Sequence, residues 1–240
     1  MLQNQVVVVT GAARGIGRYI AHTFGRAGAN LVVADIDSLD NVARELREME
    51  ADVLVVPADV RNEAQVQAMV QQAIDRFGHI DVLVNDAGIV PHFAWGVPRW
   101  ARIRDMEKSF WDRVVDTNLS GTMLCTKHVL PHMEARRSGH VINLYGGGSG
   151  SGAAAYVVSK EAIRVLTRFV AEEEREFNVC VVSISPGGAI ATEDAPEEAR
   201  NRMPSPESSG DRWVLAAQVG MELSGQLLDL KEGRIVGEAG

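Results

Sequence analysis

Short runs of apolar, mostly β-branched residues alternate with longer amphipathic stretches along the whole chain. The runs lie at residues 6–9, 31–35, 53–56, 82–85, 140–144, 179–185 and 227–230. Nearly every position within them is apolar, which is typical of strands buried on both faces of a parallel sheet. The pattern therefore predicts seven strands of an α/β protein.

Between these runs the apolar residues follow the helical period. Long helices are predicted over residues 41–50, 63–77, 111–136 and 155–177. This alternation predicts a doubly wound, mostly parallel seven-stranded sheet with helices on both faces and ligands beyond the carboxyl ends of its strands. No repeat, linker or charge block interrupts the pattern, so residues 1–240 are expected to form a single domain.

Composition narrows the class of partner. The 240 residues carry a formal net charge of −8, which disfavours binding to a phosphate backbone. No apolar stretch reaches membrane-spanning length, and the amino terminus resembles no targeting segment. Cys125 and Cys180 lie in apolar stretches, which suits free thiols in a reducing compartment. We therefore expect a cytoplasmic protein that binds neither nucleic acid nor membrane. The six histidines are scattered along the chain, and their spacing predicts no metal site.

The first apolar run leads into the glycine-rich turn GAARGIG at residues 11–17. Glycines permit a tight turn close to a pyrophosphate, and the amides of the following helix attract its charge. Asp35 ends the second strand, where a carboxylate binds ribose hydroxyls and repels a 2′-phosphate. NAD is therefore predicted over NADP, although Arg14 offers a phosphate contact, and a solvated turn at Asp35 is the alternative. The predicted contacts of the turn are Gly11, Arg14, Gly15, Ile16 and Gly17.

Tyr156 and Lys160 are four residues apart near the start of a predicted helix, and so share one helical face. A phenol titrates near pH 10 and is a poor base at neutral pH unless a nearby cation favours the phenolate. Lys160 is placed to be that cation. An ordinary amphipathic helix would also accommodate the pair, but its position after the fifth strand and a glycine-rich loop favours proton transfer.

These motifs resemble those of the short-chain dehydrogenases/reductases, over residues 5 to about 230. The family's GxxxGxG spacing matches Gly11, Gly15 and Gly17, and its YxxxK motif matches Tyr156 and Lys160. The resemblance implies a Rossmann fold, and an oxidoreductase that transfers hydride between NAD(H) and a secondary alcohol or ketone. It implies that Tyr156 exchanges a proton with the substrate oxygen and that Lys160 also binds the nicotinamide ribose. It further implies a homodimer or homotetramer.

The resemblance also implies roles for other residues. Asn118 matches a helix asparagine that supports a water chain to the lysine, and an unpartnered helical asparagine is costly. Asp59 and Val60 correspond to an adenine contact, and a proline-glycine turn to a cover over the nicotinamide. The Asn85 segment corresponds to support of the central strands, with Asp86 where the family has a second asparagine. The remaining expected cofactor contacts are Asp35, Asp59, Val60, Asn85, Ala87, Gly88, Tyr156, Lys160, Pro186, Gly187, Ile190 and Thr192.

One residue of the family's pattern is missing. The serine that normally follows three positions after an asparagine equivalent to Asn143 is replaced by Gly146. Either Ser149, or with less support Ser151, takes over the hydrogen bond to the substrate, or the glycine-rich loop has no donor. The second case leads to an alternative function, a cofactor-binding regulator or structural subunit with little turnover. The intact Tyr156, Lys160 and Asn118 favour the enzyme.

The segment 91–107 is longer than is typical of the family and rich in aromatic and arginine residues. They are His92, Phe93, Trp95, Arg99, Trp100, Arg102 and Arg104. Such side chains suit a substrate that is aromatic or carries a carboxylate or phosphate. A surface loop or subunit contact is the alternative, so the sequence leaves the substrate open.

Overall fold

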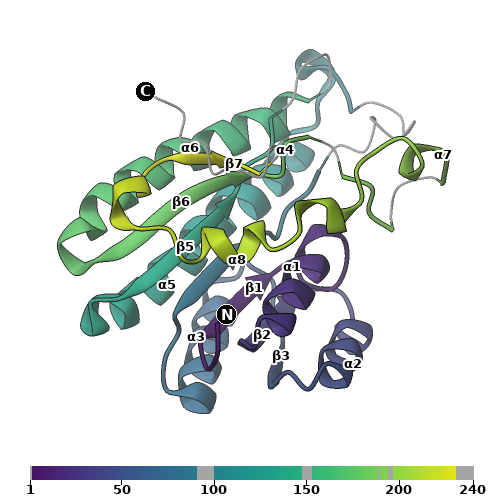
Figure 1. Cartoon of the computed structure of the whole chain (residues 1–240). Helices are drawn as coiled ribbons and strands as arrows, with labels where there is room; N and C mark the ends of the chain where they lie inside the picture. Colours follow the sequence, from purple (N-terminus) through teal and green to yellow (C-terminus); the bar gives the residue numbers. More distant parts are fainter. Residues whose placement is uncertain (1, 91–99, 148–152, 189, 194–196, 231–240) are drawn as a thin grey trace.

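Seven strands form one sheet in the computed structural model, which describes residues 2–90, 100–147, 153–188, 190–193 and 197–230. Their order is β3-β2-β1-β4-β5-β6-β7, and every neighbouring pair is parallel (Figure 1). The strands are β1 (Val6–Thr10), β2 (Asn30–Asp35), β3 (Val53–Pro57), β4 (Val82–Asn85), β5 (Gly139–Leu144), β6 (Val179–Ser185) and β7 (Leu227–Asp229). Each lies within one residue of its predicted bounds, and the predicted fold class is confirmed.

Helices cover both faces of the sheet (Figure 1). On one face lie α1 (Gly15–Arg26), α2 (Asp40–Glu48) and α8 (Arg212–Ala216); on the other lie α3 (Glu63–Phe77), α5 (Gly121–Arg136) and α6 (Ala154–Glu173). Val7 and Val9 pack into the first core, whereas Val6 and Val8 pack into the second. Because both faces are buried, the strands show no apolar-polar alternation.

The predicted helix 111–136 begins earlier and contains an irregularity. Helix α4 (Lys108–Val115) continues through the π-helical turn Asp116–Ser120 into α5. Turns of this kind are frequent at functional sites, and Asn118 lies within this one. The predicted helix 155–177 consists of α6 and a 3-10 turn. The remaining short elements are Glu174–Phe177, α7 (Glu197–Arg200), Ile103–Asp105, Pro206–Ser209 and Met221–Leu223.

The sheet order places a switch point beside β1, because β1 lies between β2 and β4. The connection from β1 to β2 uses α1 on one face, and the connection from β3 to β4 uses α3 on the other. Ligands of open α/β sheets bind at such a point, beyond the carboxyl ends of the strands. Within the described part of the chain, no helix is long and apolar enough to cross a bilayer.

Candidate active site

A cavity of about 700 Å³ opens at the carboxyl ends of the strands. It brings together segments from the turn after the first strand to the loop after the sixth, which are about 180 residues apart in the sequence. The predicted site residues that line it are Gly11, Arg14, Gly15, Ile16, Asp35, Asp59, Val60, Ala87, Gly88, Tyr156, Lys160, Pro186, Ile190 and Thr192.

Other predicted residues are not part of the cavity lining. Gly17, Asn85 and Asn118 are buried behind it, and Gly187 is half-buried next to it. Ser149 and its alternative Ser151 lie outside the described residues, as do residues 91–99. The described residues include no group of three or more His, Cys, Asp or Glu side chains that could hold a metal ion.

The glycine-rich turn folds as it does because side chains would not fit. Gly11 has a φ of +71°, and a Cβ there would lie 2.7 Å from the Cα of Ala87. A Cβ on Gly17 would lie 2.2 Å from the carbonyl oxygen of Gly11. The turn therefore brings β1, the chain after β4 and the start of α1 into close contact.

Asp35 lies at the end of β2 with a fixed carboxylate. Its Oδ2 accepts a hydrogen bond from the amide of Ala13 at 2.9 Å, and its Oδ1 accepts one from the amide of Asp37 at 3.0 Å. Arg14 lies 3.6 Å from Asp37, and both of these side chains are exposed. The rim next to the glycine turn thus carries two carboxylates and one guanidinium.

Asn85 holds the central strands together. Its Nδ2 donates to Oδ1 of Asn143 on β5 at 2.8 Å and to Oγ1 of Thr126 on α5 at 3.1 Å. On the neighbouring β1, Oγ1 of Thr10 accepts from the amides of Asp86 and Ala87, both at 3.2 Å. These bonds fix the chain after β4 relative to β1 and β5, which fits the supporting role that the resemblance implied.

Asn118 is fully buried, and its side chain is satisfied by three hydrogen bonds. Its Oδ1 accepts from the amide of Ile89 at 2.7 Å, and its Nδ2 donates to the carbonyl of Ile89 at 3.1 Å and to Oγ of Ser159 at 3.0 Å. The π-helical turn is thereby joined to the chain after β4 and to the residue next to Lys160. Its part in a water chain stays a prediction.

Tyr156 and Lys160 occupy the first two turns of α6, and both line the cavity. The Nζ of Lys160 is buried and donates to the carbonyl of Leu144 at 2.8 Å. Burial lowers the pKa of Lys160 from its ordinary value, although the charge of Asp86 opposes this shift.

The pKa of the Tyr156 phenol is shifted in the direction opposite to the one expected from the sequence. Burial raises the pKa of Tyr156, and the electrostatic influence of the nearby Asp86 and Tyr145 raises it further. The sequence predicted a phenol whose pKa is lowered by Lys160, and the structure gives the opposite direction. The physical reason is that removing the hydroxyl from water disfavours the phenolate, while burial also destabilises the charged form of the lysine.

Asp86 adds a buried carboxyl to the same cavity. Its Oδ1 is buried and has no hydrogen-bond partner among the described residues, and its Oδ2 lies 2.6 Å from the position of a Cβ on Gly17. Burial raises the pKa of Asp86, and Lys160 acts in the opposite direction. Asp86 and Lys160 therefore form a coupled pair, in which each group affects the charge of the other.

Gly146 is in direct contact with Tyr156. A Cβ at Gly146 would lie 1.8 Å from the phenolic oxygen of Tyr156. The phenol thus occupies the space that any side chain at position 146 would need. This contact gives a physical reason for the glycine at the position where the resembling family has serine.

The segment after β6 closes the cavity from another side. Ile190 and Thr192 are buried lining residues, and Pro186 lines the cavity next to β6. The amide of Gly187 donates to Oγ of Ser185 at 3.1 Å. The Cγ2 of Thr192 lies 3.8 Å from the position of a Cβ on Gly15, so this segment lies against the glycine-rich turn.

This arrangement can be compared with known proteins. A family model described as short chain dehydrogenase matches residues 5–202, which is most of the chain. The chain belongs to this short-chain dehydrogenase family. Membership makes it a dehydrogenase or reductase of CH–OH groups and implies an NAD(P) cofactor.

Individual members of the family are similar to this short-chain dehydrogenase over most of their length. It is 35% identical to the (2S)-[(R)-hydroxy(phenyl)methyl]succinyl-CoA dehydrogenase subunit BbsD of Thauera aromatica, over 78% of this chain and 73% of the relative. It is also 35% identical to the cis-4-hydroxycyclohexanecarboxylate dehydrogenase of Sinomonas cyclohexanicum, over 78% and 74%. The crystal structure of levodione reductase has a TM-score of 0.84 and 26% identity, covering 97% of this chain and 98% of the other.

One wall of the cavity in this short-chain dehydrogenase is aromatic. The rings of Trp100 and Phe110 meet edge to face with centroids 4.9 Å apart, and the guanidinium of Arg113 lies 5.3 Å from the Phe110 centroid. All three line the cavity. The described end of the segment 91–107 thus reaches the site.

Sequence reasoning missed several residues of the site. Phe110 and Arg113 lie in an ordinary amphipathic helix, and no local signal distinguishes them. Tyr145, which directly precedes Gly146, also lines the cavity, and its hydroxyl donates to Glu161. Glu193 follows Thr192 and contacts Gly15, 178 residues earlier in the chain. Only long-range packing brings these groups to the site.

Proposed function

We propose that this protein transfers hydride between NAD(H) and a secondary alcohol or ketone, with Tyr156 as the general acid or base. The observation that carries the proposal is one cavity lined by the glycine-rich turn, Asp35, Tyr156 and Lys160. Following NADH absorbance over a panel of alcohols and ketones tests it. Tight NADH binding without turnover on any of them would instead support a regulator or structural subunit.

The residues present fit a dinucleotide. The N-terminal amide of α1, that of Gly15, donates to the carboxylate of Glu193 at 3.0 Å. This helix end thus binds an anionic group in this structure. The glycine-rich turn would hold the pyrophosphate, Asp35 the adenosine ribose, Asp59 and Val60 the adenine, and Lys160 the nicotinamide ribose. When bound, the nicotinamide supplies or accepts the hydride.

Tyr156 is suited to donate a proton. Its raised pKa keeps the phenol protonated at neutral pH, so it is ready to protonate the oxygen of a ketone that receives hydride. In the reverse direction the phenolate accepts the proton of the alcohol, and this form becomes more populated as the pH rises. We also propose that Ser149 hydrogen-bonds the substrate oxygen and that Asn118 positions the lysine.

The proposed preference for NAD over NADP rests on Asp35. Its carboxylate lies at the rim that would face a 2′-phosphate, and like charges close to each other repel. Asp35→Asn keeps the shape of the side chain and removes the charge. We expect the ratio of kcat/KM for NAD to kcat/KM for NADP to fall by about tenfold or more. Asp40→Asn, which removes an exposed charge at the start of α2, is the control. An unchanged ratio in Asp35→Asn would exclude this origin of the preference.

Asp86 is expected to affect the pH dependence. Its negative charge raises the pKa of Tyr156, so Asp86→Asn should lower that pKa. Alcohol oxidation requires the phenolate of Tyr156, so the pH–rate profile of this reaction should move to lower pH. The shift should be about one pH unit for each tenfold decrease in the proton affinity of the phenolate. Asp37→Asn, a charge removal at the rim, should leave the midpoint in place. A profile that stays in place or moves to higher pH in Asp86→Asn would contradict this electrostatic role.

The substrate is proposed to be a ring-bearing molecule with an acidic group. Trp100 and Phe110 offer an apolar, aromatic surface, and Arg113 offers a positive charge beside them. Two relatives carry names of substrates that combine a ring with a carboxylate or thioester. The assay panel should therefore pair hydroxy or keto cyclohexane carboxylates and aryl analogues with their uncharged counterparts.

We further propose one domain, a cytoplasmic location and a homodimer or homotetramer. All seven strands belong to one sheet, and Cys125 and Cys180 are buried free thiols. On α6, Val158, Val165 and Phe169 share one helical face, and each is about half exposed or more. An exposed apolar face of this kind is typical of subunit contacts. Light scattering at several concentrations measures the assembly.

A further inference from the structure

The N-terminus of α1 is capped by Glu193, a residue 178 positions further along the chain. Arg14 at the N-cap position makes no side-chain hydrogen bond to the helix, and the first turn contains no acidic residue. Glu193 supplies the missing charge, since its Oε1 accepts from the amide of Gly15 at 3.0 Å. A carboxylate at this position is stabilised by the partial positive charge of the helix end.

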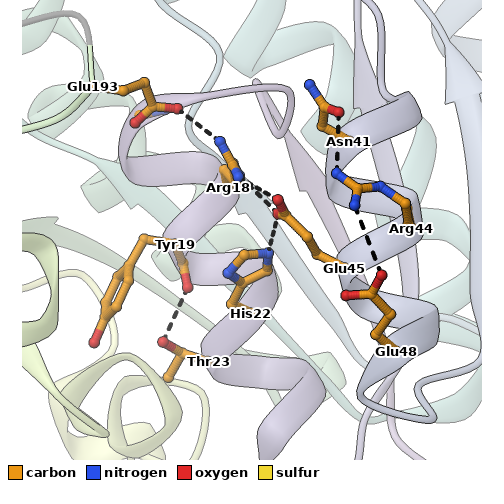
Figure 2. Close-up of polar contacts among 10 residues, drawn as sticks. Arg18, Tyr19, His22, Thr23, Asn41, Arg44, Glu45, Glu48 and Glu193 are labelled. Carbon is orange, nitrogen blue, oxygen red and sulfur yellow. Dashed lines mark hydrogen bonds and ion pairs between the residues drawn. The ribbon is translucent and has the colours of Figure 1, made fainter.

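Arg18 holds the same carboxylate from the side. Its Nη1 donates to Oε1 of Glu193 at 3.3 Å, and its Nε donates to Oε2 of Glu45 on α2 at 2.9 Å (Figure 2). Glu45 also lies 3.0 Å from Nε2 of His22. Figure 2 shows Arg18 between the two glutamates, so α2 holds this guanidinium in place whether or not Glu193 is bound.

The amide that Glu193 occupies belongs to the glycine-rich turn, where the dinucleotide's pyrophosphate is expected. Gly15 lines the cavity, and Thr192 brings the segment after β6 against it. A phosphate oxygen and a carboxylate oxygen cannot both accept from this amide in the same place, and their negative charges repel each other.

We propose that Glu193 is an internal competitor of the cofactor's pyrophosphate and thereby determines how tightly the dinucleotide binds. The carboxylate must leave the amide of Gly15 before a phosphate takes its place, while Arg18 remains as a donor beside the incoming charge. This inference rests on the proposed function, because it assumes that the dinucleotide binds at the glycine-rich turn.

Glu193→Ala should bind NADH more tightly, by about two- to thirtyfold, the range expected for one charge at a helix terminus. Fluorescence titration of NADH and calorimetric titration of ADP-ribose measure the Kd values directly, without turnover. Adenosine, which lacks phosphates, should bind wild type and variant equally. The melting temperature without ligand should fall by roughly 2 °C, because the helix loses its cap.

Glu198→Gln is the matched control. This glutamate lies five residues further along, is exposed, and contacts only the exposed Arg202 at 4.0 Å among the ion pairs of the described residues. Its substitution changes the net charge by the same amount without affecting Gly15. A gain in both variants would indicate long-range electrostatics and overturn the competition. Equal Kd values for NADH in wild type and Glu193→Ala would overturn the inference alone, whereas wild type that binds neither NADH nor ADP-ribose would overturn the proposed function beneath it.

Discussion

Tyr156→Phe is expected to lower turnover by about a hundred- to ten thousandfold, the contribution of a positioned acid or base. The hydroxyl is the only atom lost, and it lies in the cavity beside Gly146. Because the ring remains, the affinity for NADH should stay within about twofold. Steady-state kinetics on a ketone or alcohol, with NADH titration by fluorescence, separates the two effects.

A matched control is available on the neighbouring strand end. Tyr145 also lines the cavity, but its hydroxyl donates to Glu161 at the protein surface. Tyr145→Phe removes the same atom at a site that is not proposed to exchange protons, and we expect a loss of less than about tenfold. Full activity of Tyr156→Phe would show that another group transfers the proton.

Gly146→Ser is expected to lower turnover, although it restores the residue that the family usually has. The new Cβ would lie 1.8 Å from the phenolic oxygen of Tyr156, so the phenol must move. A displacement of about 1 Å at a reacting group costs about a hundredfold in rate. Because the displaced atom is the end of a side chain, the fold should persist, with a melting temperature close to that of wild type.

Gly147→Ser provides the comparison. A Cβ at Gly147 has its nearest neighbour, the hydroxyl of Tyr145, at 3.6 Å, which is ordinary van der Waals contact. This variant adds the same side chain one residue away and should retain activity within a few fold. A higher kcat in Gly146→Ser would mean that Tyr156 moves away from position 146 during the reaction and that a serine there contributes a hydrogen bond.

The elements of the fold were predictable because their signals are local. An apolar run such as residues 179–185 can be satisfied only by burial on both faces, and the structure has β6 over the same residues. The irregularity at Asp116–Ser120 was not predictable, because its apolar spacing fits an α-helix. The π-helical turn places Asn118 where it bonds to Ile89 and Ser159, and neither contact is evident from residue spacing.

The candidate site likewise has features that the sequence predicted and features that it did not. The glycine-rich turn and Asp35 were recognisable because the turn follows one strand and Asp35 ends another, and the sheet brings the strand ends together. The direction of the pKa shift of Tyr156 was predicted wrongly, because spacing reveals the nearby lysine but not the burial of the hydroxyl or the charge of Asp86. Desolvation depends on every atom around a group, and residues distant in sequence supply those atoms.

By itself, the sequence determined the α/β class, the seven strands, the glycine-rich turn and the pairing of Tyr156 with Lys160 on one helix. These follow from periodicity and from spacing within single elements. Only the tertiary structure decided that Tyr156 fills the space at Gly146 and that Glu193 caps α1. Contacts of this kind depend on where separate elements meet, and distances of a few ångströms between them are not encoded in any local pattern.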